Sequence, residues 1–483
     1  MHDTDEFFQT HDALTSAQPR TLWAINSSER ELTGKLDRSH FLISVYERML
    51  WPNTGTDDWQ VGRGSFRLKF PDSPDQEHLK PDIVLLDGIS HQFQPLLLLE
   101  DAQSLLGTKG ELVLVVRQDK GDAPPRMVQW LEYVDAIAAR LGMHRDAGAE
   151  QAWSALLRES VRSYRKNSNP VRWRISFADR KDYQAVAHLF ELVFGHPLSR
   201  TLWEWKYGQG RGNAVIASRE AGLVAHYGGM YRDVRMFGSP EWVLQIGDVM
   251  VHPKERGVMT RQGPFLLTAA TSAEINGPYG FGFPTTRAMQ VAEKMGLYSE
   301  VDQLVEMHWS PLPRKLVIQS QLQVLDLQDP STKSVVNQLW ERLAADLAGS
   351  VIGVRDWSYL SHRYGVHPHN QYEVLLVRAR LTRQPLGIIV VRIADNSCEL
   401  LDVIGPLQNL CHLLIQARRA CWLRNAGRLY CWITKSHMRY FSDCGGKDRD
   451  INISIPASTW TNDDRAMAMK GKWWLMGGDT DFR

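Results

Sequence analysis

Apolar runs and amphipathic stretches alternate along the first 150 residues. Residues 81–88 and 111–117 are almost continuously apolar, which predicts two buried parallel strands. Residues 96–106 and 127–141 have helical spacing, and Gly142 is a typical helix stop. Strand, helix, strand and helix in this order predict an α/β, doubly wound, Rossmann-like domain.

A different pattern begins at residue 171. Residues 171–177 alternate as a strand does, and Asp179 is a helix cap before an amphipathic helix over 180–194. Further strands are predicted at 214–218, 223–230, 243–251 and 281–283, and further helices at 265–274 and 286–294. This segment is therefore a second, mixed α/β domain.

The last third of the chain resembles the middle third. Trp357–Gly365 matches Trp203–Gly208, since both end in a basic residue, tyrosine and glycine before a predicted strand. Leu400–Val403 matches Ile246–Val249. An internal repeat at this spacing favours duplication over chance similarity. Residues 315–335 would connect the two copies, while Trp473-Trp474 and the tail 477–482 would complete and cap the last strand.

Composition narrows the class of protein. Basic and acidic residues number 56 and 55 for a net charge of +1, so no nucleic-acid partner is expected. No apolar run approaches the ~20 residues of a membrane helix, and the acidic start lacks a signal-peptide pattern. Five cysteines with no C-x-x-C spacing predict reduced thiols, neither a disulfide framework nor a metal site, in a cytoplasmic protein.

The pattern of residues 81–142 resembles the C-terminal half of class I S-adenosylmethionine methyltransferases. Such enzymes hold their cofactor on a glycine-rich turn after the first strand. Upstream of residue 80 the glycines are Gly34, Gly55, Gly62 and Gly64, and none follows an apolar strand in a G-x-G setting. Residues 1–150 are therefore expected to be a truncated domain without methyltransferase activity.

The middle segment resembles the GNAT (N-acetyltransferase) superfamily. The strand at 243–251 runs into His252-Pro253-Lys-Glu-Arg256-Gly257, and Phe281–Pro284, a helix and Met295–Leu297 follow in the family's order. The resemblance implies a GNAT domain at 165–315 and a degenerate GNAT-like domain at 335–483. It also implies an acyl-CoA cofactor, acetyl-CoA first, and a small amine acceptor.

The resemblance places the CoA pyrophosphate at the loop before the helix 265–274, where backbone N–H groups and the helix dipole favour phosphate. The candidate ligands are Arg256, Gly257, Arg261, Gln262, Gly263 and Phe265. The loop is about five residues longer than the family's compact pattern, and Pro264 suits the first helical position. A surface loop with solvated arginines is the alternative. A backbone N–H near Met250 or Val251 would bind the thioester oxygen.

Proton transfer is less clearly encoded. Ala292 stands where many GNAT enzymes have a tyrosine acid. Tyr298 would substitute for it, unless it is a core tyrosine. Asp248 would accept the amine's proton through a water, unless it caps a turn.

Three residues are candidates for the acceptor pocket: Trp205, His226 and Tyr227. Their alternative role is packing against the sheet, which is the commoner use of such side chains. His252 is expected to be a structural loop residue.

Two other functions remain open. Ala292 and the lengthened loop favour a non-catalytic GNAT-like scaffolding protein. An acyl-CoA decarboxylase, or an acyl shuttle to a carrier protein, is an analogy only. The last segment has only Gly405-Pro406 at the place of the phosphate loop, so it is not expected to bind CoA. A protein partner or homo-oligomer is possible.

Overall fold

The computed structural model describes residues 20–25, 36, 41–46, 50–51, 67–68, 79–117, 124–256, 263–277, 279–314, 317–460 and 467–480. The chain forms two compact units. Unit 1 is Met1–Pro197, Gly208–Tyr227 and Met250–Ile275; unit 2 is Leu198–Tyr207, Gly228–Val249 and Asn276–Arg483. Gly34, Gly55, Gly62 and Gly64 lie outside the described residues.

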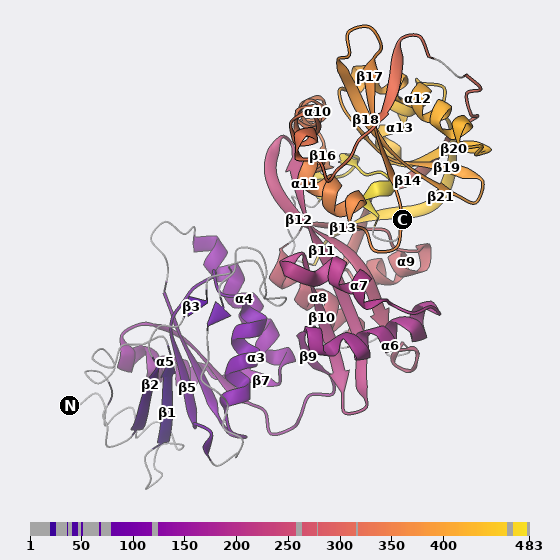
Figure 1. The fold of residues 1–483 in the computed structure, drawn as a ribbon. Helices are drawn as coiled ribbons and strands as arrows, with labels where there is room; N and C mark the ends of the chain where they lie inside the picture. Colours follow the sequence, from indigo (N-terminus) through magenta and orange to yellow (C-terminus); the bar gives the residue numbers. More distant parts are fainter. Residues whose placement is uncertain are drawn as a thin grey trace. The chain divides into compact units, whose positions relative to one another are not determined.

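Unit 1 begins with a mixed sheet of strand order β2-β1-β5-β6-β8-β7 (Figure 1). The strands β2, β1, β5 and β6 are parallel, and β8 is antiparallel to both β6 and β7. β3 (Leu50–Trp51) and β4 (Arg67–Leu68) pair antiparallel in a separate two-stranded sheet. The sheet strands are β1 Arg20–Ile25, β2 Phe41–Tyr46, β5 Ile83–Ile89, β6 Glu111–Val116, β7 Met143–Arg145 and β8 Ser160–Lys166.

Helices cover both faces of this sheet. Apolar side chains on one face pack with α3 (Pro95–Leu105) and α4 (Pro124–Arg140), which lie next to each other in Figure 1. Those on the other face pack with α5 (Ala147–Leu157). Both predicted strands and both predicted helices of this segment are present, and Gly142 has the positive φ (80°) expected at a helix stop.

The core of the N-terminal sheet continues into the next strands of the chain. β9 (Arg174–Phe177), β10 (Gly212–Arg219) and the first part of β11 (Gly222–Met236) contribute Ile175, Val215 and other residues to the apolar cluster that contains α3 and α4. The same cluster therefore holds residues from both sides of the boundary predicted near residue 150.

Two more helices complete the described helical part of unit 1. α6 (Tyr183–Phe194) follows a short 3₁₀ turn that Asp179 caps, as predicted, and ends at Gly195. α8 (Pro264–Asn276) begins with Pro264 as its first residue. Proline is suited to that position because its missing N–H would have no helical partner there.

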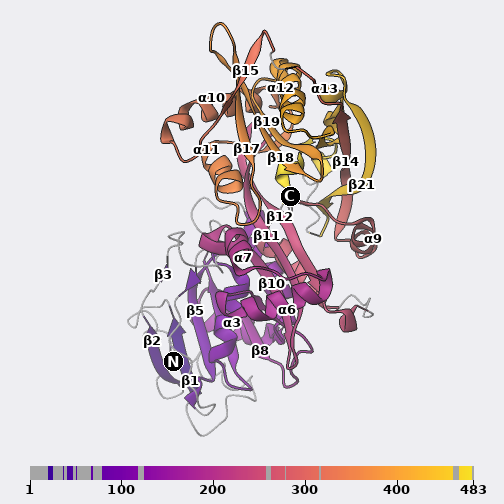
Figure 2. The ribbon, with the colours of Figure 1, turned by 45° about the vertical axis from the view of Figure 1, so that its right-hand side comes forward.

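Unit 2 contains a mixed sheet of order β15-β17-β18-β19-β20-β14-β21. β14 (Tyr298–Trp309) lies between β20 (Arg428–Thr434) and β21 (Lys447–Ser458), and Figure 2 shows β14 and β21 running side by side. The last strand of the predicted domain 165–315 thus pairs with strands of the predicted domain 335–483. The remaining strands are β15 Ser320–Val324, β17 Glu373–Ala379, β18 Pro385–Ala394 and β19 Ser397–Ile404.

Another sheet pairs segments of unit 2 that are far apart in sequence. β12 (Ser239–Val251) pairs with β13 (Gly280–Gly282), while β16 (Val351–Gly353) pairs with the end of β11. α10 (Lys333–Asp346) and α12 (Leu410–Leu423) share the main apolar core of this unit. α9 (Thr286–Lys294) has the bounds predicted from the sequence.

Two sequence expectations about strands were wrong. The connector predicted at 315–335 contains β15, which pairs antiparallel with β17. Trp473-Trp474 forms β22, which pairs with β16 in the other sheet and does not extend the last strand. Both errors concern partners distant in sequence, which a short segment's own residues do not specify.

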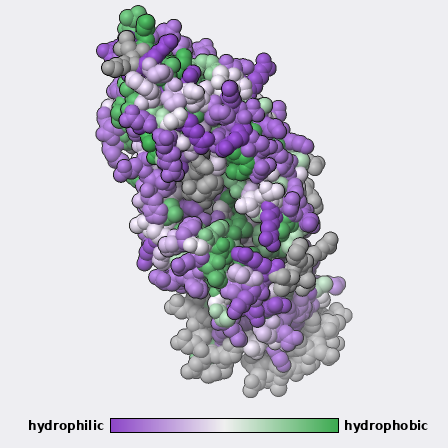
Figure 3. Space-filling model, turned by 90° about the vertical axis from the view of Figure 1, so that its right-hand side faces the viewer, coloured by the Kyte–Doolittle hydropathy of each residue, from purple (hydrophilic) through white to green (hydrophobic). Residues whose placement is uncertain are grey.

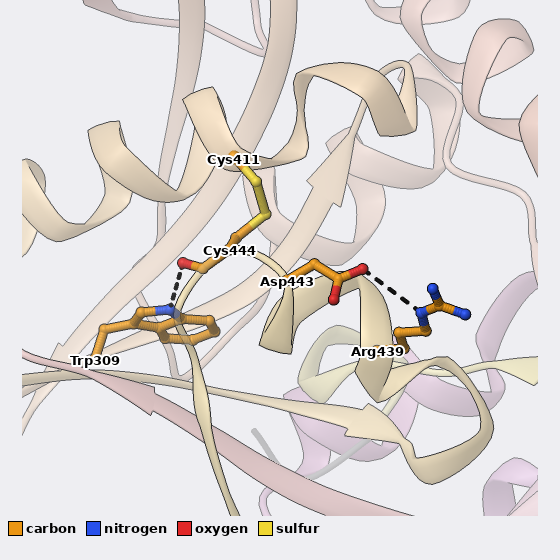
Figure 4. The surroundings of a disulfide bond; sticks show 5 residues. All are labelled: Trp309, Cys411, Arg439, Asp443 and Cys444. Carbon is orange, nitrogen blue, oxygen red and sulfur yellow. Dashed lines mark hydrogen bonds and ion pairs between the residues drawn. A yellow bond between two sulfur atoms is a disulfide. The ribbon is translucent and has the colours of Figure 1, made fainter.

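The prediction of five reduced thiols was also wrong. Cys411, at the start of α12, forms a disulfide with Cys444, which follows α13 (Met438–Ser442) (Figure 4). The backbone carbonyl of Cys444 also accepts a hydrogen bond from the indole of Trp309 (3.3 Å). The remaining cysteines, Cys398, Cys421 and Cys431, are free and buried.

No helix in the described part of the chain is both long and apolar enough to cross a membrane. The face shown in Figure 3 is largely hydrophilic with scattered hydrophobic residues, and such scattered exposure is ordinary for a folded protein.

Breaking the disulfide should destabilise unit 2. The bridge closes a loop of 33 residues, for which the chain-entropy model gives about 3–4 kcal/mol. Cys444→Ser should therefore lower the free energy of unfolding by an amount of this order in denaturant titrations. Reductant should lower wild-type stability to the same level and leave the variant unchanged; a wild type indifferent to reductant would contradict the bridge.

Glu100 on α3 should make stability depend on pH. Burial raises its pKa from 4.5 to about 7, against the opposing effect of Arg174, which lies 3.5 Å away. Because the folded-state pKa is the higher one, the stabilising contribution is present below pH ~4.5 and is lost as pH rises through about 7.

Glu100→Gln removes this titration while keeping the side-chain shape. The variant should match wild type near pH 4.5 and exceed it by about 3 kcal/mol at pH 8, as measured by chemical unfolding at both values. An equal difference at the two values would contradict the assigned cause.

Candidate functional site

β12 is distorted near its end. Asp248 has φ +51°, a left-handed conformation that non-glycine residues rarely adopt. The pairing of β12 with β13 runs from Leu244 to Ile246, and Gly247–Val251 lie beyond it. Gly282 permits this close pairing, because a Cβ there would lie 3.2 Å from the carbonyl oxygen of Ile246. This end of the strand can present backbone groups to a ligand.

Two side chains from α7 (Arg200–Tyr207) bind the Asp248 carboxylate. Lys206 Nζ lies 2.8 and 3.0 Å from its two oxygens, and the Tyr207 hydroxyl donates to Oδ2 at 2.8 Å. Lys206 is 4% exposed, so the pair is a buried salt bridge. Removing either partner would leave an uncompensated buried charge and destabilise the fold. The salt bridge fastens the end of α7 to the distorted part of β12.

Lys206 and Tyr207 were not among the site residues predicted from the sequence. The sequence feature that marks them is the repeated basic-Tyr-Gly ending, which was used only to align the two predicted copies. Because that ending precedes a strand in both copies, a shared contact with the aligned Asp248 could have been inferred.

The predicted second copy has the equivalent contact. The Tyr364 hydroxyl donates to Asp402 Oδ2 at 2.9 Å, and Tyr364 and Asp402 are the residues that the repeat aligns with Tyr207 and Asp248. The β18–β19 register shifts between Asp402 and Leu400, so this strand also carries a bulge. Arg355 supplies the cation here, with Nε 2.7 Å from Asp402 Oδ1.

The C-terminal segment packs against Arg355 in the predicted second copy. Asp479 binds Arg355 (2.5 Å) and Arg232 (3.1 Å), and all three side chains are buried. Asp402 is 0% exposed; burial raises its pKa, against the opposing effect of Arg355. A Cβ at Gly478 would lie 2.0 Å from the Tyr364 hydroxyl. The C-terminal segment therefore packs closely against the Tyr364 hydroxyl.

The predicted cofactor residues in unit 1 are partly described. Met250 is buried, and the carbonyl of Val251 accepts a hydrogen bond from Arg256 Nε (3.0 Å). Gly257, Arg261 and Gln262 lie outside the described residues. His252 Nδ1 accepts from the Lys254 N–H (3.2 Å), and the backbone N–H of His252 donates to the Val224 carbonyl (2.8 Å), as expected of a structural loop residue.

The start of α8 is described from Gly263. Gly263 is buried and its carbonyl accepts the Leu267 N–H (3.0 Å), so it precedes the helix directly. Phe265 is half-buried. The Thr268 hydroxyl donates back to the Pro264 carbonyl (2.9 Å), which is an intrahelical use. The first backbone N–H groups of α8 are those that the phosphate prediction requires.

The predicted acceptor residues are mostly buried. In unit 2, Trp205 stacks on His362 (5.0 Å between ring centroids) and its indole N–H donates to the His362 carbonyl (3.1 Å). The ring of His367 lies 4.6 Å away; burial and Arg363 lower the His367 pKa to about 3. The predicted role of Trp205 in acceptor binding stays a prediction.

The other candidates have different surroundings. His226 is fully buried and Tyr227 is 4% exposed, both on β11 in unit 1. Tyr298 is the first residue of β14 in unit 2, where it pairs with Ser458 of β21. Across the described ranges, the His, Cys, Asp and Glu side chains form no group of three that could hold a metal ion.

Residues 174–263 match the family described as acetyltransferase (GNAT) domain. The match likens this stretch of the chain to a GNAT acetyltransferase domain. No curated protein matches the chain significantly.

Several solved structures are similar to this chain at low identity. A protein from Enterococcus faecalis V583 described as a probable N-acyltransferase has 12% identity and a TM-score of 0.49, with 60% of this chain and 73% of that chain covered. A GCN5-related N-acetyltransferase from Anabaena variabilis has 11% identity and a TM-score of 0.45, with 59% and 72% covered.

An N-myristoyltransferase of Saccharomyces cerevisiae, solved with bound myristoyl-CoA, has 11% identity and a TM-score of 0.39, with 59% of this chain and 80% of that chain covered. These proteins are too distant to indicate the substrate.

The Lys206–Asp248 pair should be strongly coupled. Lys206→Met leaves a buried carboxylate without its cation and should cost about 3–5 kcal/mol of unfolding free energy. Lys206→Met combined with Asp248→Leu should cost clearly less than the two single variants together, in a double-mutant cycle by denaturant unfolding.

Arg200→Met on the same helix is the matched control. Its ion pair with Glu204 is exposed, so the expected change is at most about 0.5 kcal/mol. Additive effects of Lys206→Met and Asp248→Leu would contradict the pairing.

Proposed function

We propose that the protein is an acyl-CoA-dependent N-acyltransferase, with acetyl-CoA as its cofactor and a small amine as acceptor. The cofactor is held by the GNAT domain predicted at 165–315. The observation that carries the proposal is the end of β12, where Gly247–Val251 lie beyond the pairing with β13. The family match over residues 174–263 covers this strand and supports the proposal.

The proposed chemistry is direct transfer. The amine nitrogen attacks the thioester carbonyl carbon, and the carbon–sulfur bond breaks as CoA leaves as a thiolate, which takes up the proton that the amine gives up. A backbone N–H near Met250 or Val251 would stabilise the oxyanion. The amine's proton would pass through a water to Asp248, whose carboxylate Lys206 and Tyr207 hold in place.

The CoA pyrophosphate would bind at the start of α8. That helix begins at Pro264, directly after the loop that contains the candidate arginines. Its first N–H groups and dipole favour an anion. Arg256 would turn from the Val251 carbonyl to a phosphate, which is the stronger, charge-assisted partner.

A GNAT-like scaffolding protein without catalysis is the second candidate. Ala292, at the place of the usual tyrosine acid, is 0% exposed. Tyr298 begins a paired strand, so its role as substitute acid is a proposal of its own. The scaffolding function predicts CoA binding without turnover, or no CoA binding at all.

Two further features belong to the proposal. Residues 335–483 would form a degenerate second GNAT-like domain without CoA. Asp402 is fully buried, and the Leu407 N–H already donates a hydrogen bond to the carboxylate of Asp346 (2.6 Å). Residues 1–150 would form a truncated Rossmann-like domain without S-adenosylmethionine. The protein would act in the cytoplasm.

Calorimetric titration of the full chain with acetyl-CoA and CoA tests the proposal. Arg256→Ala and Arg261→Ala should each weaken CoA binding about tenfold, because each removes a charge-assisted phosphate contact. Arg439→Ala, an exposed arginine paired with Asp443, is the control and should bind normally. Wild-type affinity in both loop variants would overturn the placement of the pyrophosphate.

A further inference from the structure

The N-terminal segment is joined to α8 by one buried ion pair. Arg140, the last residue of α4, binds both carboxylate oxygens of Glu274 in the last turns of α8, with Nη2 2.8 Å from Oε1. Arg140 Nη1 also donates to the Thr271 hydroxyl at 3.0 Å. The two ionic side chains are 12% and 4% exposed. Arg140 therefore fixes two positions of α8 at once.

The position of Glu274 is electrostatically unfavourable for a carboxylate. A carboxylate near the C-terminal end of a helix opposes the helix dipole, and burial adds a desolvation cost. A bidentate guanidinium is the partner that best offsets both. The position of Glu274 thus depends on a cation that another segment of the chain supplies.

Apolar packing links the same elements. Leu267 and Ile275 of α8 pack against the cluster that contains Val134 and Ile137 of α4. Val251, at the end of β12, packs against this cluster too. The core of the N-terminal segment therefore supports both elements to which the proposed function assigns the acyl-CoA.

We propose that Arg140 is a positioning residue for the cofactor, and that the N-terminal segment is a brace for α8. The helix has 13 residues, so fixing its C-terminal half to α4 sets the direction of its N-terminal end. That end is where the pyrophosphate would bind. This inference rests on the proposed function and assigns the first segment a task that needs no cofactor of its own.

The test compares CoA with pantetheine, which lacks the pyrophosphate, in calorimetric titrations of the full chain. Arg140→Lys keeps the charge but loses the bidentate contact. Arg140→Met with Glu274→Met replaces the pair by apolar side chains, which often preserves stability. Arg145→Lys is the matched control, because Arg145 makes a bidentate pair with Glu150 within the N-terminal segment.

CoA should bind about tenfold more weakly to the double variant than to wild type. The loss of CoA affinity should be smaller in Arg140→Lys, and pantetheine affinity should stay at the wild-type level in both variants. Arg145→Lys should change neither. Unchanged CoA affinity in a folded double variant overturns the inference, and so does an equal loss for CoA and pantetheine. A folded wild type that binds no CoA overturns the proposed function itself, which separates the two failures.

Discussion

A hydrogen bond between an aspartate on a distorted strand and a tyrosine at a helix end occurs twice in unit 2. Asp248 is held by Tyr207 and Lys206, and Asp402 is held by Tyr364 with Arg355 as the cation. A strand with a left-handed or bulged residue needs surrounding contacts that fix it. These buried carboxylates supply them, and a buried ion pair is costly to separate.

The two segments that the sequence aligns differ in the residues that follow the aspartate. After Asp248 the strand leads to a loop and to α8, the helix proposed to bind the pyrophosphate. After Asp402, Met476–Thr480 fills the adjacent space and Asp346 binds the Leu407 N–H. We therefore place the proposed ligand site after Asp248, while the buried contacts of Asp402 stabilise unit 2. The exchange of β14 and β16 between the two predicted domains ties them into one structure.

The sequence predicted the local elements well. α9 and the strands β5 and β6 depend on hydrophobic spacing and on glycine or proline near their ends, which the residues themselves carry. The aligned repeat also contained the tyrosines and aspartates of the two Tyr–Asp contacts, although the contacts between them were not inferred from the sequence.

Non-local features could not be predicted in this way. The partners of β15 and β22 and the Cys411–Cys444 bridge depend on which distant segments meet. Gly257, Arg261 and Gln262 stay predictions, as do the catalytic roles of Asp248 and Tyr298. Backbone ligands such as Met250 leave no side-chain signal in a sequence.

Amide hydrogen exchange with and without saturating CoA tests whether the end of β12 and the start of α8 bind the cofactor, because backbone N–H groups are the proposed ligands. We expect slower exchange at Gly247–Val251 and at Gly263–Leu267, and unchanged exchange at Ile404–Leu410 of the predicted second copy. Exchange unaffected by CoA in the first two segments, or protection at Ile404–Leu410 in their place, would contradict this expectation.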